Sequence, residues 1–361
     1  MLLQIGAALL IAGFAGFIVH TTASHLAERN MSSGFGFLGD PAGFVIGESL
    51  IPFDAQDSYL RAMAVCGLNT LLVSLLSCAA ATVLGGVVGV ARLATNPLPR
   101  RLAALYVMLF RNTPLLLQII LWYALLQALP PVRQAIPLGT AVFLSQRGLR
   151  LPSLDLHEPA RLAPLLVVGA LLWLVARRPA ILAWRRPVLA VLLLVGIGAV
   201  VEVSRSVDVL VPVRRGFNFA GGLEMSPEFT ALLAGLVLYY AAYIAEIVRG
   251  GILAVPRGQW DAARALGLPS WPVLRRVVLP QALRAITPPL TLEYVGIIKS
   301  SSLGILVGYP ELFWSVSTMV GQNGHAIEGI SLLMLAYLVP SLGAAAAMNA
   351  FNRRLLRGGV A

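Results

Sequence analysis

The chain has 361 residues, of which 58% are hydrophobic and only 12% are charged. About a quarter of the residues of a typical soluble domain are charged, so this composition leaves too few charges for a soluble surface, and it also excludes disorder. Two cysteines exclude a disulfide scaffold, and the net charge of +11 lies in short arginine clusters between apolar runs rather than on one nucleic-acid-binding face. We therefore predict an all-α polytopic membrane protein.

A helix needs about 20 apolar residues to cross the hydrocarbon core of a bilayer. Eight apolar runs are found in chain order, near 2–20, 63–91, 102–127, 162–176, 187–201, 229–248, 288–308 and 326–351. The fourth and fifth runs are short, and we interpret them as two spans extended by flanking arginines, with a re-entrant pair as the alternative. No basic residue precedes the first run, which favours a retained helix over a secretory signal. The sequence thus predicts about eight transmembrane helices.

The distribution of basic residues predicts which loops face the cytoplasm. Sixteen Lys and Arg residues fall in one set of loops and nine in the opposite set. The richer set comprises 92–101, 177–186, 249–284 and 352–361. Because short loops rich in arginine stay in the cytoplasm, both termini are predicted to be cytoplasmic, and an even number of crossings fits that arrangement.

The loop after the sixth span begins with a predicted short helix. Pro256-Arg-Gly258 interrupts the preceding helix, and 259–266 is rich in helix-forming residues. Asp261 would lie in the first turn, where a carboxylate suits the helix dipole, and Gly267 is a natural C-terminal stop.

A second short helix is predicted after a sharp bend. Ser270 can cap this helix, and Pro280 ends the segment. The first helix would expose Trp260, Ala262, Ala263 and Leu266. Such a helix, parallel to the membrane, can insert into a groove on a soluble partner; an amphipathic linker among the lipid headgroups is the alternative.

The residues of this loop resemble the EAA loop of ABC-importer permeases. The resemblance rests on Asp261-Ala-Ala263, Gly267 and Val277-x-Leu279-Pro280, with Asp for the usual Glu and Val for the usual Ile. The segments at 110–118, 241–252 with Gly258-Gln259, and 298–303 resemble the polar amino-acid branch of that family. The long layout, with Gly34-Phe-Gly-Phe-Leu38 and Glu48-Ser-Leu-Ile-Pro52, is similar to larger subunits of general L-amino-acid importers.

The resemblance implies a five-helix permease core with additions. The implied parts are an N-terminal helix and periplasmic segment at 1–59, the first part of the core at 60–127, inserted periplasmic loops and a helical hairpin at 128–226, and the second part of the core at 227–361, with a cytoplasmic coupling loop at 256–280. The coupling residues it implies are Gly258, Gln259, Trp260, Asp261, Ala262, Ala263, Leu266, Gly267 and Pro280.

The implied function is that of a permease subunit in an importer for L-amino acids, polar or of broad range, in a bacterial cell inner membrane. A P-loop needs Gly-x4-Gly-Lys-[Ser/Thr], and the only lysine, Lys299, follows Ile298, so we expect no ATPase, no enzymatic chemistry and no cofactor on this chain. ATP and Mg would bind a separate cytoplasmic ABC ATPase in two copies. The resemblance also implies a second related permease subunit or a self-copy, and a periplasmic amino-acid-binding protein.

Charged residues inside a span need a partner or a wet cavity, because insertion at the bilayer centre costs about 2.5–3.5 kcal/mol. Arg111 precedes Asn112 and Thr113 in the third predicted span, whereas Glu293 and Lys299 lie in the seventh. These residues either line a substrate path, where they would meet the carboxylate or ammonium of an amino acid, or form interhelical ion pairs and headgroup contacts. Six residues separate Glu293 from Lys299, so the two are not neighbours on the helix surface.

Two further features are predicted to be structural. Glu246 has Arg249 three residues later, which favours a local ion pair, and Pro114 is expected to kink its helix. Four scattered histidines give no metal-binding spacing, and no catalytic cluster is found. The alternative function is a secondary amino-acid transporter driven by an ion gradient, which would have no need of the Asp261–Gly267 pattern.

Overall fold

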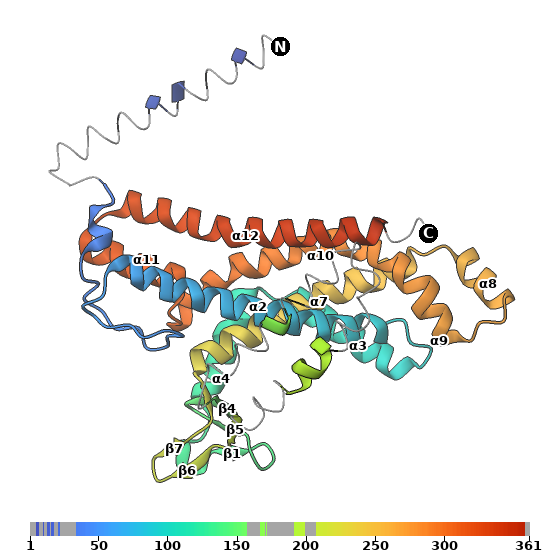
Figure 1. Ribbon diagram of the computed structural model, residues 1–361, viewed down its shortest axis with the longest axis horizontal. Coiled ribbons are helices and arrows are strands. Elements are labelled where there is room, and N and C mark those ends of the chain that lie inside the picture. The colour runs from blue at the N-terminus through green and yellow to red at the C-terminus, as the bar shows by residue number, and fades with distance from the viewer. Residues whose placement is uncertain are drawn as a thin grey trace. The chain divides into compact units, whose positions relative to one another are not determined.

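The structure is a computed structural model, which describes residues 34–156 and 207–357 together with scattered residues in 5–21 and 167–198. The chain divides into two compact units. Unit 1 comprises Met1–Ile120 and Ala231–Ala361, and unit 2 comprises Leu121–Thr230. In the described residues, unit 1 is built of helices and unit 2 contains short strands (Figure 1).

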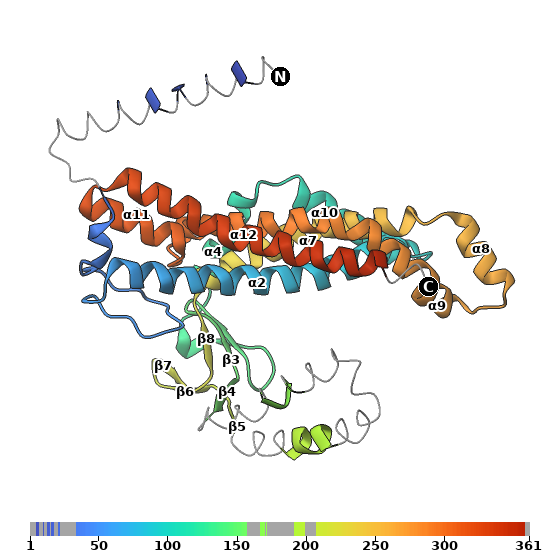
Figure 2. The ribbon, with the colours of Figure 1, turned by 45° about the horizontal axis from the view of Figure 1, so that its top comes forward.

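The first helices of the described chain are η1 (Gly36–Gly39), α2 (Tyr59–Ala91), α3 (Pro97–Arg111) and α4 (Leu115–Gln127). After unit 2 follow α7 (Pro227–Leu253), α8 (Arg257–Ala265), α9 (Ser270–Pro272), the π-helical η5 (Val273–Val278), α10 (Leu279–Ser300), η6 (Ser301–Val307), α11 (Leu312–Asn323) and α12 (Ala326–Arg357). Helix α10 packs against α2 and α12, and α11 packs against the same two helices (Figure 2).

Four described helical stretches are long and apolar enough to cross a membrane: Tyr59–Ala91, Pro227–Leu253, Ser270–Val307 and Ala326–Leu356. Helices α3 and α4 meet at a bend of 103° and together count as a fifth. The mostly helical membrane fold is therefore confirmed, as is the break at Pro114. The predicted runs near 2–20 and 162–176 lie largely outside the described residues, and of the run near 187–201 the structure describes 191–198 as helix.

Small residues let α2 and α7 approach closely. A Cβ atom at Gly85 would lie 2.8 Å from the carbonyl oxygen of Ala241, and one at Gly89 would lie 2.7 Å from that of Ala245. Gly86, beside Gly85, has open space around it. Helices in lipid associate mainly through such close backbone packing, so the two glycines set the distance between α2 and α7.

The chain between η1 and α2 packs over the ends of α2 and α11 in an apolar cluster that includes Phe37, Ile46, Val316 and Met319. Asn69 of α2 holds this segment in place, because its side-chain amide donates to the carbonyl oxygens of Glu48 (2.8 Å) and Pro310 (2.9 Å). The buried polar backbone at this end of the helices is thereby satisfied.

A fully buried carboxylate begins α11. Glu311 accepts hydrogen bonds from the backbone N–H groups of Phe313 and Trp314, both at 2.8 Å, and from the hydroxyl of Tyr337 on α12. Burial raises the pKa of the Glu311 carboxyl to about 7, although these three hydrogen bonds act in the opposite direction. The carboxylate therefore caps α11 and connects it to α12.

Among its described residues, unit 2 holds η2 (Val132–Gln134) and eight short strands in three antiparallel sheets, of which the largest has the order β1-β2-β3-β8. The strands are β1 (Ile136–Pro137), β2 (Phe143–Ser145), β3 (Gly148–Leu151), β4 (Ser153–Leu156), β5 (Val207–Leu210), β6 (Val213–Arg215), β7 (Asn218–Ala220) and β8 (Leu223–Met225). The sequence predicted loops here and not strands. Gly148 permits the close pairing of β3 with β8, because its φ is +87° and a Cβ would meet the Met225 carbonyl oxygen at 2.1 Å.

Candidate functional site

Helix α8 forms the short helix predicted in the loop after α7, but it starts two residues earlier than expected. Pro256 stands at the N-cap with φ −56°, which already suits a helix, so Arg257 and Gly258 join the first turn. Asp261 consequently lies in the second turn rather than in the first.

The face that α8 exposes also differs from the prediction. Ala263 is buried and Trp260 is half-buried, because both pack against Ile252, Val255 and other apolar side chains of α7, η5 and α10. All the other residues of 257–266 stay exposed, including Asp261, Ala262, Ala265 and Leu266. Leu266 is 81% exposed, so a large apolar side chain stands at the end of α8 with nothing in the described chain covering it.

Gly267 ends α8, as predicted. Its φ is +75°, and its N–H donates to the carbonyl oxygen of Arg264 (2.9 Å). The N–H of Leu268 donates to the carbonyl oxygen of Ala263 (3.3 Å). This pair of bonds is a Schellman motif, in which the residue after the helix adopts a left-handed conformation that suits glycine. Leu268 then packs on the same apolar cluster as Ala263, which fixes the direction of the chain after the bend.

The second helix does not end at Pro280. Helical structure continues from Ser270 through α9, η5 and α10 to Val307, and Pro280 lies in the first turn of α10. The wide turns of η5 come directly before Pro280, whose nitrogen has no hydrogen to donate to the preceding turn. Ser270 is the first residue of α9 and not its cap, which is Pro269.

A hollow of about 380 Å³ lies beside α8. Its apolar lining comes from Leu93, Ile252, Leu253, Val255 and Trp260, and its charged lining from Arg257, Asp261 and Arg264. Asp261 and Arg264 are 3.9 Å apart and mostly exposed, so the pair contributes little to stability and remains available to a partner. An apolar hollow edged by both signs of charge can receive side chains of another protein.

The second candidate site is a polar cluster centred on Glu246 of α7. Its carboxylate pairs with Arg92 at the end of α2 and with Arg249 at 3.0 Å, and it lies 3.9 Å from Arg111. Burial lowers the pKa of Arg92, and the charges of Arg249 and Arg111 lower it further. The predicted Glu246–Arg249 pair is present. The sequence places Arg92 only in a loop, so it does not predict the pairing of Arg92 with Glu246.

Arg111, Asn112 and Thr113 lie together at the bend between α3 and α4. The guanidinium of Arg111 stands 5.0 Å from the centre of the Tyr243 ring, in a hollow of about 330 Å³ that Asn112 and Glu246 also line. Thr113 instead serves the bend itself, since its hydroxyl donates to the Leu109 carbonyl and accepts from the Gln118 amide.

Lys299 of α10 is not brought into this cluster, whereas Glu293 of α10 lies within electrostatic reach of Arg111. Glu293 is half-buried, Lys299 is exposed, and within the described ranges neither forms an ion pair. Nearby on α10, Ser300 and Tyr294 bond to Tyr240 (2.8 Å) and Thr82 (2.7 Å), which joins α10 to α7 and α2. The residues at 111–113 are consecutive in the sequence, so what the structure adds to the predicted path is the approach of Glu293 to Arg111.

Residues 81–357 match the family described as binding-protein-dependent transport system inner membrane component. The chain belongs to this family. The predicted resemblance to ABC-importer permeases is thereby confirmed, and a secondary transporter is not favoured.

Two similar relatives extend along almost the whole permease. YhdX of Escherichia coli (strain K12), provisionally named an amino-acid ABC transporter permease protein, is 43% identical over 98% of this chain and 93% of its own. AapQ of Rhizobium johnstonii, named a general L-amino acid transport system permease protein, is 40% identical over 98% of this chain and 91% of its own. A crystal structure of an amino acid ABC transporter with histidines resembles the permease with a TM-score of 0.51 at 20% identity, over 82% of this chain and 95% of that one, which shows a shared fold.

Proposed function

We propose that this permease imports L-amino acids, polar or of broad range, as half of the translocation path of an ATP-binding-cassette importer. The names of YhdX and AapQ support this substrate class. The partners would be two copies of a cytoplasmic ATPase that binds ATP and Mg, a second related permease subunit or a self-copy, and a periplasmic amino-acid-binding protein. The excess of arginine in the loops at 92–101 and 249–284 supports a bacterial inner-membrane location with both termini cytoplasmic.

The exposed end of α8 is the observation that carries this proposal. Helix α8 is anchored by Ala263 and Trp260, yet it presents Asp261, Ala262 and Leu266 beside an apolar hollow. We assign the coupling role to this helix together with its flanking residues Gly258, Gln259, Gly267 and Pro280. Closure of the ATPases on ATP would move α8, and the helices attached to it would switch between inward- and outward-facing states.

Substitution of Leu266 tests the coupling role. Leu266→Ser removes an apolar side chain that is 81% exposed, so the fold should be unaffected. Loss of one well-buried leucine from an interface costs about 1.5–3 kcal/mol, which weakens ATPase binding by roughly 10–100-fold. The matched control is Leu356→Ser, at another exposed leucine near the end of α12. Co-purification of the ATPase and its ATP hydrolysis in the presence of binding protein and amino acid are measured for both variants, and equal behaviour of the two would contradict the assignment.

The substrate path is assigned to Arg111, Asn112, Thr113, Glu293 and Lys299. The hollow beside Arg111 and Asn112 supports the assignment for those two, since it is polar and holds a guanidinium able to bind a carboxylate. For Lys299, exposure on α10 supports contact with a paired permease or with the path. Uptake into vesicles by Lys299→Ala and Arg111→Gln complexes tests each residue, and unchanged affinity and rate at normal expression would exclude it.

A further inference from the structure

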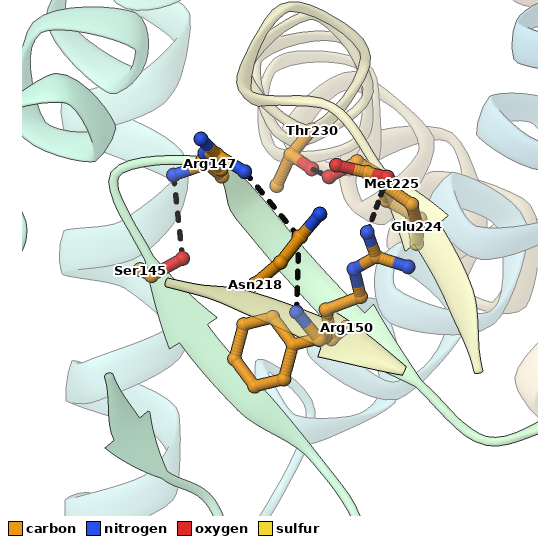
Figure 3. A network of polar contacts seen from close by, with 8 residues as sticks. Ser145, Arg147, Arg150, Asn218, Glu224, Met225 and Thr230 are labelled. Carbon is orange, nitrogen blue, oxygen red and sulfur yellow. Dashed lines mark hydrogen bonds and ion pairs between the residues drawn. The ribbon is translucent and has the colours of Figure 1, made fainter. Parts of the chain in front are cut away.

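Four exposed arginines surround the β6–β7 hairpin of unit 2. They are Arg133 of η2, Arg147 in the turn before β3, and Arg214 and Arg215 of β6. Glu224 of β8, an acidic residue of the β1-β2-β3-β8 sheet, pairs with Arg150 and not with any of these four arginines (Figure 3). Within the described ranges, none of the four arginines forms an ion pair, so their positive charge remains unneutralised on one small surface.

Aromatic rings, an amide side chain and a carbonyl oxygen hold three of these four guanidiniums in place. Arg133 lies 3.6 Å above the centre of the Phe217 ring, and Arg214 lies 5.6 Å from that of Phe143 and donates to the Arg133 carbonyl oxygen (3.4 Å). Arg147 donates to the side-chain oxygen of Asn218 (3.3 Å), which in turn accepts from the Phe219 N–H (Figure 3). A stacked guanidinium keeps its N–H edge free, so Arg133 and Arg214 are held in place and still able to bind an anionic group.

The same surface carries exposed apolar side chains. Phe217 is 70% exposed, Val213 is 56% exposed and Leu223 is 52% exposed. Arginine and aromatic residues are the types enriched where proteins bind each other, and they are the most frequent hot-spot residues. Ordered arginines that alternate with exposed apolar side chains on a small sheet therefore fit a protein surface better than a lipid surface.

We propose that this basic hairpin surface, formed by Arg133, Arg147, Arg214, Arg215 and Phe217, docks an acidic face of the periplasmic amino-acid-binding protein. The inference rests on the proposed function, which places the loops at 128–161 and 202–228 on the periplasmic side. Charge complementarity then defines the matching face of the binding protein. That face would carry carboxylates opposite the arginines and an apolar side chain in contact with Phe217. Because the arginines are exposed, they act mainly on the association rate and on its salt dependence.

The test uses the complete importer in nanodiscs with its binding protein. Two exposed charge pairs contribute together about 1 kcal/mol, so Arg214→Gln/Arg215→Gln should weaken binding about fivefold at low salt. The difference should largely vanish at about 0.5 M salt, because exposed charges are then screened. Arg214→Lys/Arg215→Lys should retain most of the affinity. The matched control, Arg353→Gln/Arg354→Gln, removes an adjacent exposed pair from α12 and should bind like the wild type.

Binding that is unchanged in the Arg214→Gln/Arg215→Gln complex, or weakened equally in the α12 control, overturns the proposal. Normal binding-protein affinity combined with lost adhesion to phosphatidylglycerol vesicles also overturns it and assigns the surface to lipid. Failure of the proposed function is distinguishable, because the wild-type complex would then show no ATP hydrolysis stimulated by binding protein and amino acid.

Discussion

The glycines between α2 and α7 give a prediction that separates packing from helix propensity. Gly85→Ala and Gly89→Ala each place a methyl group against backbone of α7, at 2.8 Å and 2.7 Å from carbonyl oxygens. Gly86→Ala adds the same methyl group to the same helix, one residue away, in open space. All three substitutions gain about 1 kcal/mol of helix propensity, so their differences report packing alone.

The magnitude follows from the backbone atoms in contact. A carbonyl oxygen of a packed helix cannot rotate away as a side chain does, so α2 and α7 have to separate by roughly half an ångström. Overpacking of this kind costs about 1–3 kcal/mol. We therefore expect Gly85→Ala and Gly89→Ala to be less stable than Gly86→Ala by about that amount, whereas Gly86→Ala should be as stable as the wild type or slightly more so.

The assay is thermal unfolding of the detergent-solubilised complex, followed by the fraction that remains monodisperse in size-exclusion chromatography after heating. The midpoints for Gly85→Ala and Gly89→Ala should lie several degrees below that for Gly86→Ala. If the three variants unfold together, α2 and α7 are not in the close contact described, and the reasoning fails. The double variant Gly85→Ala/Gly89→Ala should be the least stable, since both substitutions push the same two helices apart.

Three further changes have defined outcomes. Gly267→Ala forces a left-handed backbone at the end of α8 and should cost about 1 kcal/mol, seen as faster hydrogen exchange of α8, whereas Gly258→Ala inside α8 should not increase exchange. Glu311 ionises with a raised pKa, so the stability that its protonated form contributes is complete below about pH 4.5 and is lost as the pH rises through about 7. The free energy of unfolding of the complex should therefore fall by about 1 kcal/mol between pH 6 and 8. Glu311→Gln should abolish this pH dependence in thermal unfolding. Glu246→Gln removes the carboxylate shared by several arginines and should lower the free energy of unfolding by about 1–2 kcal/mol, a value discounted for partial exposure. A thermal unfolding midpoint equal to that of the wild type would contradict this prediction.

The membrane helices could be predicted because a span of about 20 apolar residues is a local property of the sequence. The same holds for the break at Pro114 and for the end of α8 at Gly267, where one residue type determines the backbone. Residues 241–252 and the Asp261–Gly267 pattern could likewise be matched to a family from their order alone.

Features that depend on distant contacts could not be predicted. The strands of unit 2 are two to four residues long, and β3 meets β8 only after more than 70 intervening residues, so no local periodicity marks them. Ala263 was expected on the exposed face of α8, but the packing of η5 and α10 turns that side inward. The partnership of Arg92 with Glu246 likewise joins the end of one helix to the middle of another.

Helix α7 runs without a break from Pro227, two residues after β8, to Leu253, four residues before α8. Its 27 residues correspond to a rod of about 40 Å. An internal proline or glycine hinge would let such a rod bend, yet beyond its first residue α7 contains no proline, and Gly235 lies tightly against Ile119. The two other glycines of α7, Gly250 and Gly251, stand in the last turn, so neither could act as a hinge in the middle of the helix. A tilt of about 5° imposed at one end of such a rod would shift its other end by roughly 3–4 Å, so α7 can convert a small tilt at one end into a displacement of several ångströms at the other.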